Sequence, residues 1–179
     1  EPFKPAMRIT LFAIIVLLNA IPATGQQGKK IERITSQLAA AGSDSTRVRL
    51  LTELALEYKA SDTTRAFALI EQARELATGT SDDRGTGLCY AALGKIRYFH
   101  GDYNKTISDF EIAKSRLHRS GLQGTYADVM VDQGNAHLFL SQYDIALSKY
   151  DSARRVFSEL DHTAGLIRCL NNMGIIYKN

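Results

Sequence analysis

The feature that most constrains this chain is a pattern of residue types that returns every forty positions. Three sets of residues keep the interval exactly, and a fourth set upstream of them keeps it except for one residue missing before residue 66. The sets are Ala66, Thr106 and Ala146; Ile70, Phe110 and Tyr150; Ala73, Ala113 and Ala153; and Ala55, Gly94, Gly134 and Gly174. A constant period between about twenty and fifty residues is typical of a stacked repeat array.

The helical spacing of apolar residues predicts the elements within each unit. We expect helices over residues 29–41, 46–60, 65–77, 86–100, 103–118, 126–140, 143–160 and 162–178, separated by short segments rich in Gly, Ser and Asp. Connections of a few residues make consecutive helices pack antiparallel. The sequence therefore predicts an all-α fold, an α-solenoid of antiparallel helix pairs with about three and a half repeats.

The same pattern predicts how the chain is divided. We expect an N-terminal capping helix and linker, followed by a repeat array that ends after the first helix of a fourth unit. Such an end leaves an apolar face uncovered, which favours a chain that is a fragment of a longer protein. The expected segments are residues 26–45 for the cap and linker, 46–179 for the array, and 46–82, 83–122, 123–161 and 162–179 for its repeats.

Small residues inside the predicted helices indicate close helix packing. Gly94, Gly134 and Gly174 each lie within a first helix, where glycine costs about 0.5 to 1 kcal/mol relative to alanine. The recurrence of that cost predicts that a neighbouring helix packs onto each glycine. We expect the larger gaps between layers to be filled by Tyr103, Phe110, Tyr143 and Tyr150.

The two cysteines occupy equivalent positions two units apart. In a stacked array Cys89 and Cys169 lie on the order of 20 Å from each other, which is too far for a disulfide. We therefore expect two small buried side chains with free thiols.

The N-terminus has the pattern of a secretory signal. Arg8 precedes an apolar run over residues 9–18, which is shorter than the roughly 20 residues of a membrane span, and Ala23-Thr24-Gly25 is a small-x-small cleavage site. We expect residues 1–25 to be removed and the mature chain to begin near Gln26 outside the cytoplasm. An uncleaved N-terminal anchor helix is the alternative.

The repeated residues resemble the tetratricopeptide repeat (TPR). Its Leu-Gly, Gly-Asp-Tyr and Ala-aromatic-Ala elements have counterparts in Leu93-Gly94, Gly101-Asp102-Tyr103 and the series Thr106, Phe110 and Ala113. The chain departs from the family where Arg97 and His137 replace an aromatic residue and Gln133 replaces a leucine, and its period is forty rather than thirty-four. The resemblance implies a right-handed superhelix and suggests helices that are longer than usual.

The resemblance also implies a binding surface, because the first helices of such arrays line a concave groove that holds a protein or peptide. Asparagine side chains there can bond to the backbone of an extended peptide, and Lys95 and Arg168 can take a carboxylate. The alternative is an ordinary solvated helix face. The implied residues are Arg49, Thr52, Glu53, Lys59, Lys95, Tyr98, Asp128, Asp132, Asn135, Arg168, Asn171 and Asn172.

A narrower resemblance concerns the whole arrangement. A secretory signal, a short helix and forty-residue repeats are similar to the extracytoplasmic sensor regions of bacterial signalling proteins, especially those of Bacteroidetes. The implied function is a non-catalytic sensor or scaffold module, exported to the periplasm or the outer face of the inner membrane. The alternatives are a stand-alone periplasmic or secreted adaptor, and part of a histidine kinase or nucleotide cyclase whose catalytic domain lies beyond Asn179.

The sequence contains no recognisable catalytic or cofactor motif. Gly85-x-Gly87 lacks the third glycine of a dinucleotide loop, and the four histidines have no metal-ligand spacing. The net charge of +3 is small, and no basic run interleaves with aromatic residues. We therefore expect no cofactor, no metal and no nucleic-acid partner, and membrane contact only through the signal or an unseen downstream span.

Overall fold

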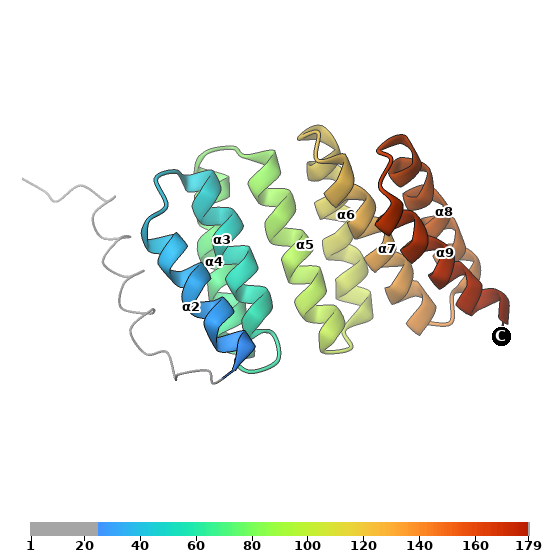
Figure 1. Cartoon of the computed structure of the whole chain (residues 1–179), viewed down its shortest axis with the longest axis horizontal. Coiled ribbons are helices and arrows are strands. Elements are labelled where there is room, and N and C mark those ends of the chain that lie inside the picture. The colour runs from blue at the N-terminus through green and yellow to red at the C-terminus, as the bar shows by residue number, and fades with distance from the viewer. Residues whose placement is uncertain (1–24, 179) are drawn as a thin grey trace, which may run out of the picture.

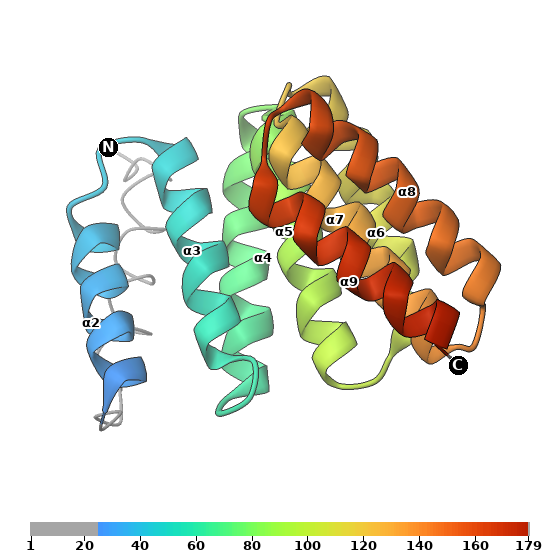
Figure 2. The same cartoon turned by 45° about the vertical axis from the view of Figure 1, so that its right-hand side comes forward.

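The computed structural model describes residues 25–178, which form an all-α solenoid. Each helix packs against its neighbours in chain order, from α2 at one end to α9 at the other (Figure 1, Figure 2). The predicted fold class is confirmed. The helices are α2 (Gln26–Ala39), α3 (Asp44–Tyr58), α4 (Thr63–Gly79), α5 (Asp83–Phe99), α6 (Tyr103–Arg119), α7 (Gln123–Phe139), α8 (Tyr143–Glu159) and α9 (Thr163–Lys178).

Helix length explains the forty-residue period. The helices α5, α6, α7 and α8 each have 17 residues and are separated by three-residue turns. The helices α5 and α7 begin three residues before the predicted starts at 86 and 126, at Asp83 and Gln123. The start of α5 was predicted too late because Gly85 was taken for a turn residue, whereas it lies buried inside α5. It packs against the end of α4, where an added Cβ would lie 3.1 Å from the Ala77 Cβ.

The turns share one hydrogen-bonding pattern. The middle residue of each has a positive φ, and the next backbone N–H donates to a carbonyl five residues earlier, as from Asp102 to Arg97 at 3.0 Å and from Gln142 to His137 at 2.9 Å. This Schellman geometry satisfies carbonyls that a helix end would otherwise leave unpaired. The positive-φ residues are Ser81, Gly101, Gly121, Ser141 and Asp161.

The first unit is one residue shorter than the others, and the difference lies around the turn between α3 and α4. The helix α3 has 15 residues, two fewer than α5, and a four-residue turn follows it. Here the N–H of Asp62 donates to the carbonyl of Tyr58, four residues earlier, at 2.9 Å. The helices α3 and α4 still pack against each other, so the shorter period changes the turn and not the pairing.

Aromatic rings pack onto two of the three helical glycines singled out in the sequence. A Cβ added at Gly134 would lie 2.5 Å from the Tyr150 ring, and one at Gly94 would meet Phe110 equally closely. Both rings are completely buried. At Gly174 an added Cβ would meet nothing within 4 Å, because no second helix of this unit lies among the described residues. The prediction was wrong for Tyr143, which is 46% exposed.

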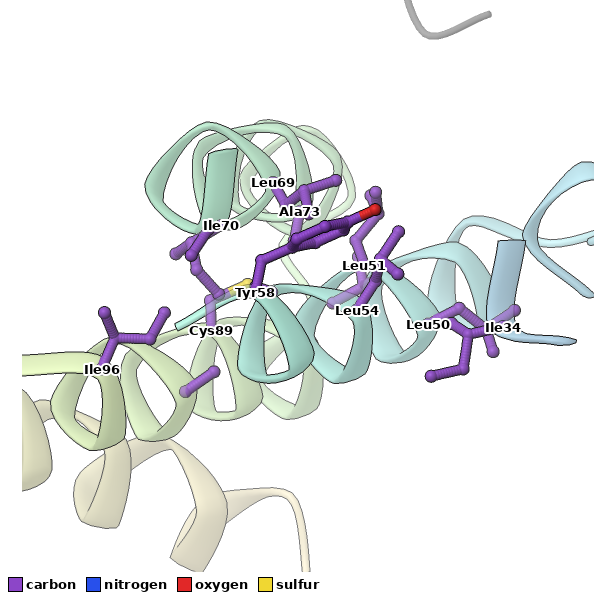
Figure 3. Packing of buried hydrophobic residues seen from close by; sticks show 14 of the residues in the cluster. Ile34, Leu50, Leu51, Leu54, Tyr58, Leu69, Ile70, Ala73, Cys89 and Ile96 are labelled. Atoms are coloured by element: carbon purple, nitrogen blue, oxygen red, sulfur yellow. The ribbon is translucent and has the colours of Figure 1, made fainter. Parts of the chain in front are cut away.

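Both cysteines are buried and free, as predicted. Cys89 lies with Tyr58, Ile70 and Ile96 in the core formed by the N-terminal helices α2 to α5 (Figure 3). Burial raises the pKa of the Cys89 thiol to about 12, and it also raises the pKa of Cys169. These thiols are structural core groups, since a reactive cysteine needs a thiolate near neutral pH.

The N-terminal helix covers the outer side of the first pair. Ile31 and Ile34 of α2 are buried in the same cluster as Leu50 and Leu54 of α3. The Gln27 amide also donates to the Glu57 carbonyl at 2.8 Å. The predicted signal segment lies almost entirely outside the described residues. No helix among residues 25–178 has the length and apolar character of a membrane span.

The glycine contacts give a first stability prediction. Gly134→Ala should destabilise the chain by about 1 to 3 kcal/mol, because the new methyl group overlaps the buried Tyr150 ring. Gly174→Ala is the matched control and should stabilise by about 0.5 to 1 kcal/mol, because it only removes the helical cost of glycine. Denaturant unfolding checks both variants. Equal effects at the two sites would contradict the packing.

A second prediction concerns the turns. Ser141→Gly should stabilise the chain by roughly 0.5 to 1 kcal/mol, because glycine adopts the positive φ at this position without the steric cost that serine carries. Ser148→Gly, in the middle of α8, is the control and should destabilise by a similar amount. Thermal unfolding measured by circular dichroism tests the pair, and the idea fails if both substitutions lower the midpoint.

Candidate functional site

The candidate site is a hollow of about 390 Å³ on the face formed by the first helices of three successive pairs. It lies across α3, α5 and α7, with a contribution from α6 in its floor. Because equivalent helices line it, the hollow is a product of the stacking itself. Its lining residues are Leu56, Lys59, Lys95, Tyr98, Phe99, Phe110, Asp132 and Asn135.

An ion pair joins two of the helices across the hollow. Lys95 Nζ of α5 lies 3.4 Å from Asp132 Oδ2 of α7, and their side chains are 42% and 24% exposed. Burial raises the pKa of Asp132 despite the attraction of Lys95 and Arg168. Burial also raises the pKa of Tyr98 to about 12. The polar groups of the hollow are thus partly shielded from water, which strengthens their electrostatic interactions relative to those of fully exposed groups.

Lys59, the residue that follows α3, also lines the hollow. Its Nζ donates to the Leu56 carbonyl at 3.3 Å and lies 5.6 Å from the centroid of the Phe99 ring. His100 Nε2 lies 2.9 Å from the Lys59 carbonyl, so the α5–α6 turn also holds this end of α3. The two lysines of the hollow thus come from the end of α3 and from α5, and Lys59 lies beside the Phe99 ring.

An amide network continues the polar face toward α9. Asn135 Oδ1 accepts from the Tyr150 hydroxyl at 2.8 Å and from Asn172 Nδ2 at 3.0 Å. Because both bonds go to Oδ1, the Nδ2 group of Asn135 is the one left to donate to a partner. Arg168 of α9 makes an ion pair with Asp128 of α7 next to this network.

The remaining predicted residues do not line the hollow. Arg49 Nη1 and Glu53 Oε2 pair with each other at 3.4 Å on α3. Thr52 is 6% exposed, and its hydroxyl donates to the Arg49 carbonyl at 2.8 Å, so it has little surface for a ligand. Asn171 is exposed on α9. The structure thus brings Lys59, Lys95, Tyr98, Asp132 and Asn135 together at the hollow. The other seven predicted residues lie outside its lining: Arg49, Thr52, Glu53, Asp128, Arg168, Asn171 and Asn172.

Sequence reasoning missed two aromatic residues of the hollow. Phe110 was assigned only to the core, although its buried ring also forms part of the lining. Phe99 is 51% exposed and was not singled out. The available signal was the forty-residue recurrence of phenylalanine at positions 99 and 139. Phe139 lies beside the site, stacked on Tyr103 with centroids 5.1 Å apart.

A second hollow, of about 510 Å³, lies between α4 and α6. Its two arginines already have acidic partners, since Arg74 bonds to Glu71 and Arg116 Nη1 lies 2.6 Å from Asp83 Oδ1. Arg119 also makes an ion pair with Asp83. Arg119 and Arg116 together lower the pKa of the Asp83 carboxyl. This surface contains none of the residues implied by the repeat pattern.

The histidines serve local structural roles. His162 Nδ1 accepts from the Gly165 backbone N–H at 3.0 Å at the start of α9, and His137 Nδ1 lies 2.6 Å from Gln142 Oε1. Across residues 25–178, no three His, Cys, Asp or Glu side chains gather in a way that could hold a metal ion. No protein-family profile matches the chain, and no curated protein is significantly similar to it in sequence.

The electrostatics of Asp132 give a pH prediction. Burial raises its pKa, so the folded chain holds the proton more tightly than the unfolded chain does. Wild-type stability should therefore fall as pH rises from about 4 through the raised pKa. Asp132→Asn cannot ionise, so its unfolding free energy relative to wild type should increase over that range. Denaturant unfolding between pH 3 and pH 7 measures this difference.

Glu111→Gln is a control of opposite sign. Burial alone would raise the pKa of Glu111, but bonds from Gln133 and Lys114 lower it to about 2. The ionised Glu111 carboxylate therefore stabilises the folded chain above about pH 4.5, and this contribution is lost as the pH falls toward 2. The unfolding free energy of Glu111→Gln relative to wild type should decrease as pH rises from 3 to 5. A pH-independent difference for both variants would contradict these assignments.

Proposed function

We propose that this chain is a non-catalytic module that binds an extended peptide segment of another protein on the face formed by α3, α5 and α7. The observation that carries the proposal is the hollow across three first helices, with an apolar floor of Leu56, Tyr98, Phe99 and Phe110. Such a floor accommodates an apolar side chain of the peptide. Lys59, Lys95 and the Asn135 amide stand around it as polar groups that can orient the peptide.

Charge and geometry favour a peptide that combines apolar and acidic residues. Two lysines line the hollow, where Lys59 lies beside the Phe99 ring and Lys95 Nζ lies 3.4 Å from Asp132 Oδ2. The hollow has two lysines but only one carboxylate, that of Asp132, so one positive charge has no counter-charge in the lining. A carboxylate of the peptide between Lys59 and Lys95 would supply it. The Asn135 Nδ2 group would then donate to a backbone carbonyl of the same segment.

We also propose that the array is a TPR domain from the exported sensor or scaffold region of a bacterial signalling protein. The support for the first part is the recurrence of glycine, aromatic and alanine residues at the TPR positions, together with the antiparallel helix pairs. The support for the second is the order of segments in the sequence, with an apolar N-terminal run before the repeats. In such a protein, peptide binding on the array would supply the input to the output domain.

A charge-reversal experiment tests peptide binding. Peptides selected from a random display library against the purified chain are titrated against the double variant Lys59→Glu with Lys95→Glu. The matched control is Lys105→Glu with Arg155→Glu, which makes the same change of charge at exposed positions on α6 and α8. The site variant should weaken binding at least tenfold, or about 1.4 kcal/mol, and the control should bind as wild type does.

Circular dichroism of both double variants verifies that they remain folded. The proposal is wrong if the selection yields no peptide with saturable binding. It is also wrong if selected peptides bind the site variant and the control equally well, because the contact surface would then lie elsewhere on the array.

A further inference from the structure

The second hollow, of about 510 Å³, lies between the second helices α4 and α6, and residues of α5 lie between them. Each of these three helices packs between two others among residues 25–178, so the hollow is in the interior of the array. Its lining shares no residue with that of the hollow of the proposed function. We call it the α4–α6 hollow, and its lining includes Arg74, Thr78, Thr86, Tyr90, Ile112 and Arg116.

The next unit carries two rings at the positions where this unit has threonines. His118 of α6 and Tyr126 of α7 contact each other there, with ring centroids 5.4 Å apart. The residues forty positions earlier are Thr78 and Thr86, and both line the α4–α6 hollow. Because a threonine side chain is too small to fill the space of a ring, the groove between α4 and α6 stays open. The hollow therefore comes from the residues of this unit and is not imposed by the repeat.

An arginine lines the hollow on each side, Arg74 from α4 and Arg116 from α6. Glu71 accepts from Arg74 Nε at 3.1 Å, and Asp83 accepts from Arg116 Nη1 at 2.6 Å. Arg119 Nε also donates to Asp83, at 2.8 Å, so three guanidinium groups share two carboxylates in this cluster. The carboxylates hold the guanidinium groups in place, which reduces the entropy lost when a ligand binds. The cluster keeps one positive charge without a counter-charge.

The lining combines hydrogen-bond donors with apolar surface. The guanidinium groups can only donate, the hydroxyls of Thr86 and Tyr90 can donate or accept, and the described residues of the lining include no carboxylate. The Tyr90 ring and Ile112, which is 39% exposed, supply the apolar part. Such a lining fits an anionic group attached to an apolar or aromatic body.

We propose that the α4–α6 hollow binds a small organic phosphate, a phosphate monoester with an apolar or aromatic body. Because Arg74 and Arg116 come from different helices, the anion has to accept hydrogen bonds from more than one direction. A phosphate group presents three terminal oxygens in a tetrahedral arrangement, whereas a carboxylate presents two in one plane. The phosphate bonds to both arginines, and the organic body lies against Tyr90 and Ile112. A bare phosphate ion would leave most of the 510 Å³ unfilled.

The test is a nuclear magnetic resonance titration of the chain with phenyl phosphate. Amide signals of α4, α5 and α6 around the hollow should shift and saturate, with a Kd below about 1 mM. Inorganic phosphate lacks the ring and benzyl alcohol lacks the anion, so each should bind at least about tenfold more weakly. Absence of saturable shifts with phenyl phosphate overturns the proposal, and so does inorganic phosphate that binds as tightly as phenyl phosphate.

An arginine substitution with a matched control tests the anion site. Arg74→Gln should weaken the binding of phenyl phosphate about tenfold, because it removes a charged donor from the lining. Arg154→Gln is the control and should bind as wild type does. Arg154 of α8 donates from Nε and Nη2 to one oxygen of Asp151, as Arg74 does to Glu71, but it lines neither hollow. Equal effects of the two substitutions overturn the proposal.

A third variant closes the hollow. Thr86→Tyr introduces the residue that the next unit carries at the same position, Tyr126, and should abolish binding while the chain stays folded. Circular dichroism verifies the fold of each variant, and the arginine pair alone decides if this variant does not fold. Binding that a folded Thr86→Tyr variant retains overturns the proposal.

A last variant separates this site from the hollow of the proposed function. Lys59→Glu with Lys95→Glu should leave the binding of phenyl phosphate unchanged, because neither lysine lines the α4–α6 hollow. Loss of binding in this double variant would place the phosphate in the other hollow and overturn the proposal.

Discussion

The architecture depends on the close approach of the two helices in a pair, which in α5–α6 and α7–α8 is made possible by an aromatic ring that packs on a glycine. Phe110 on Gly94 and Tyr150 on Gly134 fix both the spacing and the register of their pairs. Because both partners recur at forty residues, each pair repeats the geometry of the last. The three-residue turns then add the next helix without a change of register. The hollow follows from this regularity, since it exists only where successive first helices present their faces side by side.

Polar contacts tie neighbouring helices together at positions where the chain departs from the TPR pattern. Arg97, in place of an aromatic residue, donates to both oxygens of the buried Asp109 at 2.8 and 2.7 Å. Gln133, in place of a leucine, is buried and donates to Glu111 Oε1 at 2.6 Å. A buried polar group is tolerated only when it is hydrogen-bonded, and each of these is. The departures therefore change the chemistry of the interfaces while the stacking of the helices is kept.

The periodic pattern predicted the fold and the pairing, because periodicity reports directly on which residues face a neighbouring helix. It failed at helix starts, where Gly85 resembles a turn residue although its lack of a side chain serves packing. Five of the twelve implied site residues line the hollow. The ion pairs of Lys95 with Asp132 and of Arg168 with Asp128 were not predictable, because they join residues 37 and 40 positions apart through the stacking geometry. The contribution of Phe99 was missed, although phenylalanine recurs forty residues later at position 139.

The most direct measurement of the central claim is a nuclear Overhauser experiment on the chain in solution. The account predicts cross-peaks from the Gly134 Hα protons to the Tyr150 ring and from the Gly94 Hα protons to the Phe110 ring, because each ring lies against its glycine. Absence of both sets of cross-peaks in a folded, helical sample would contradict the account. Other contacts would then hold the helix pairs together, and the ring-on-glycine packing could not explain either the fold or the hollow.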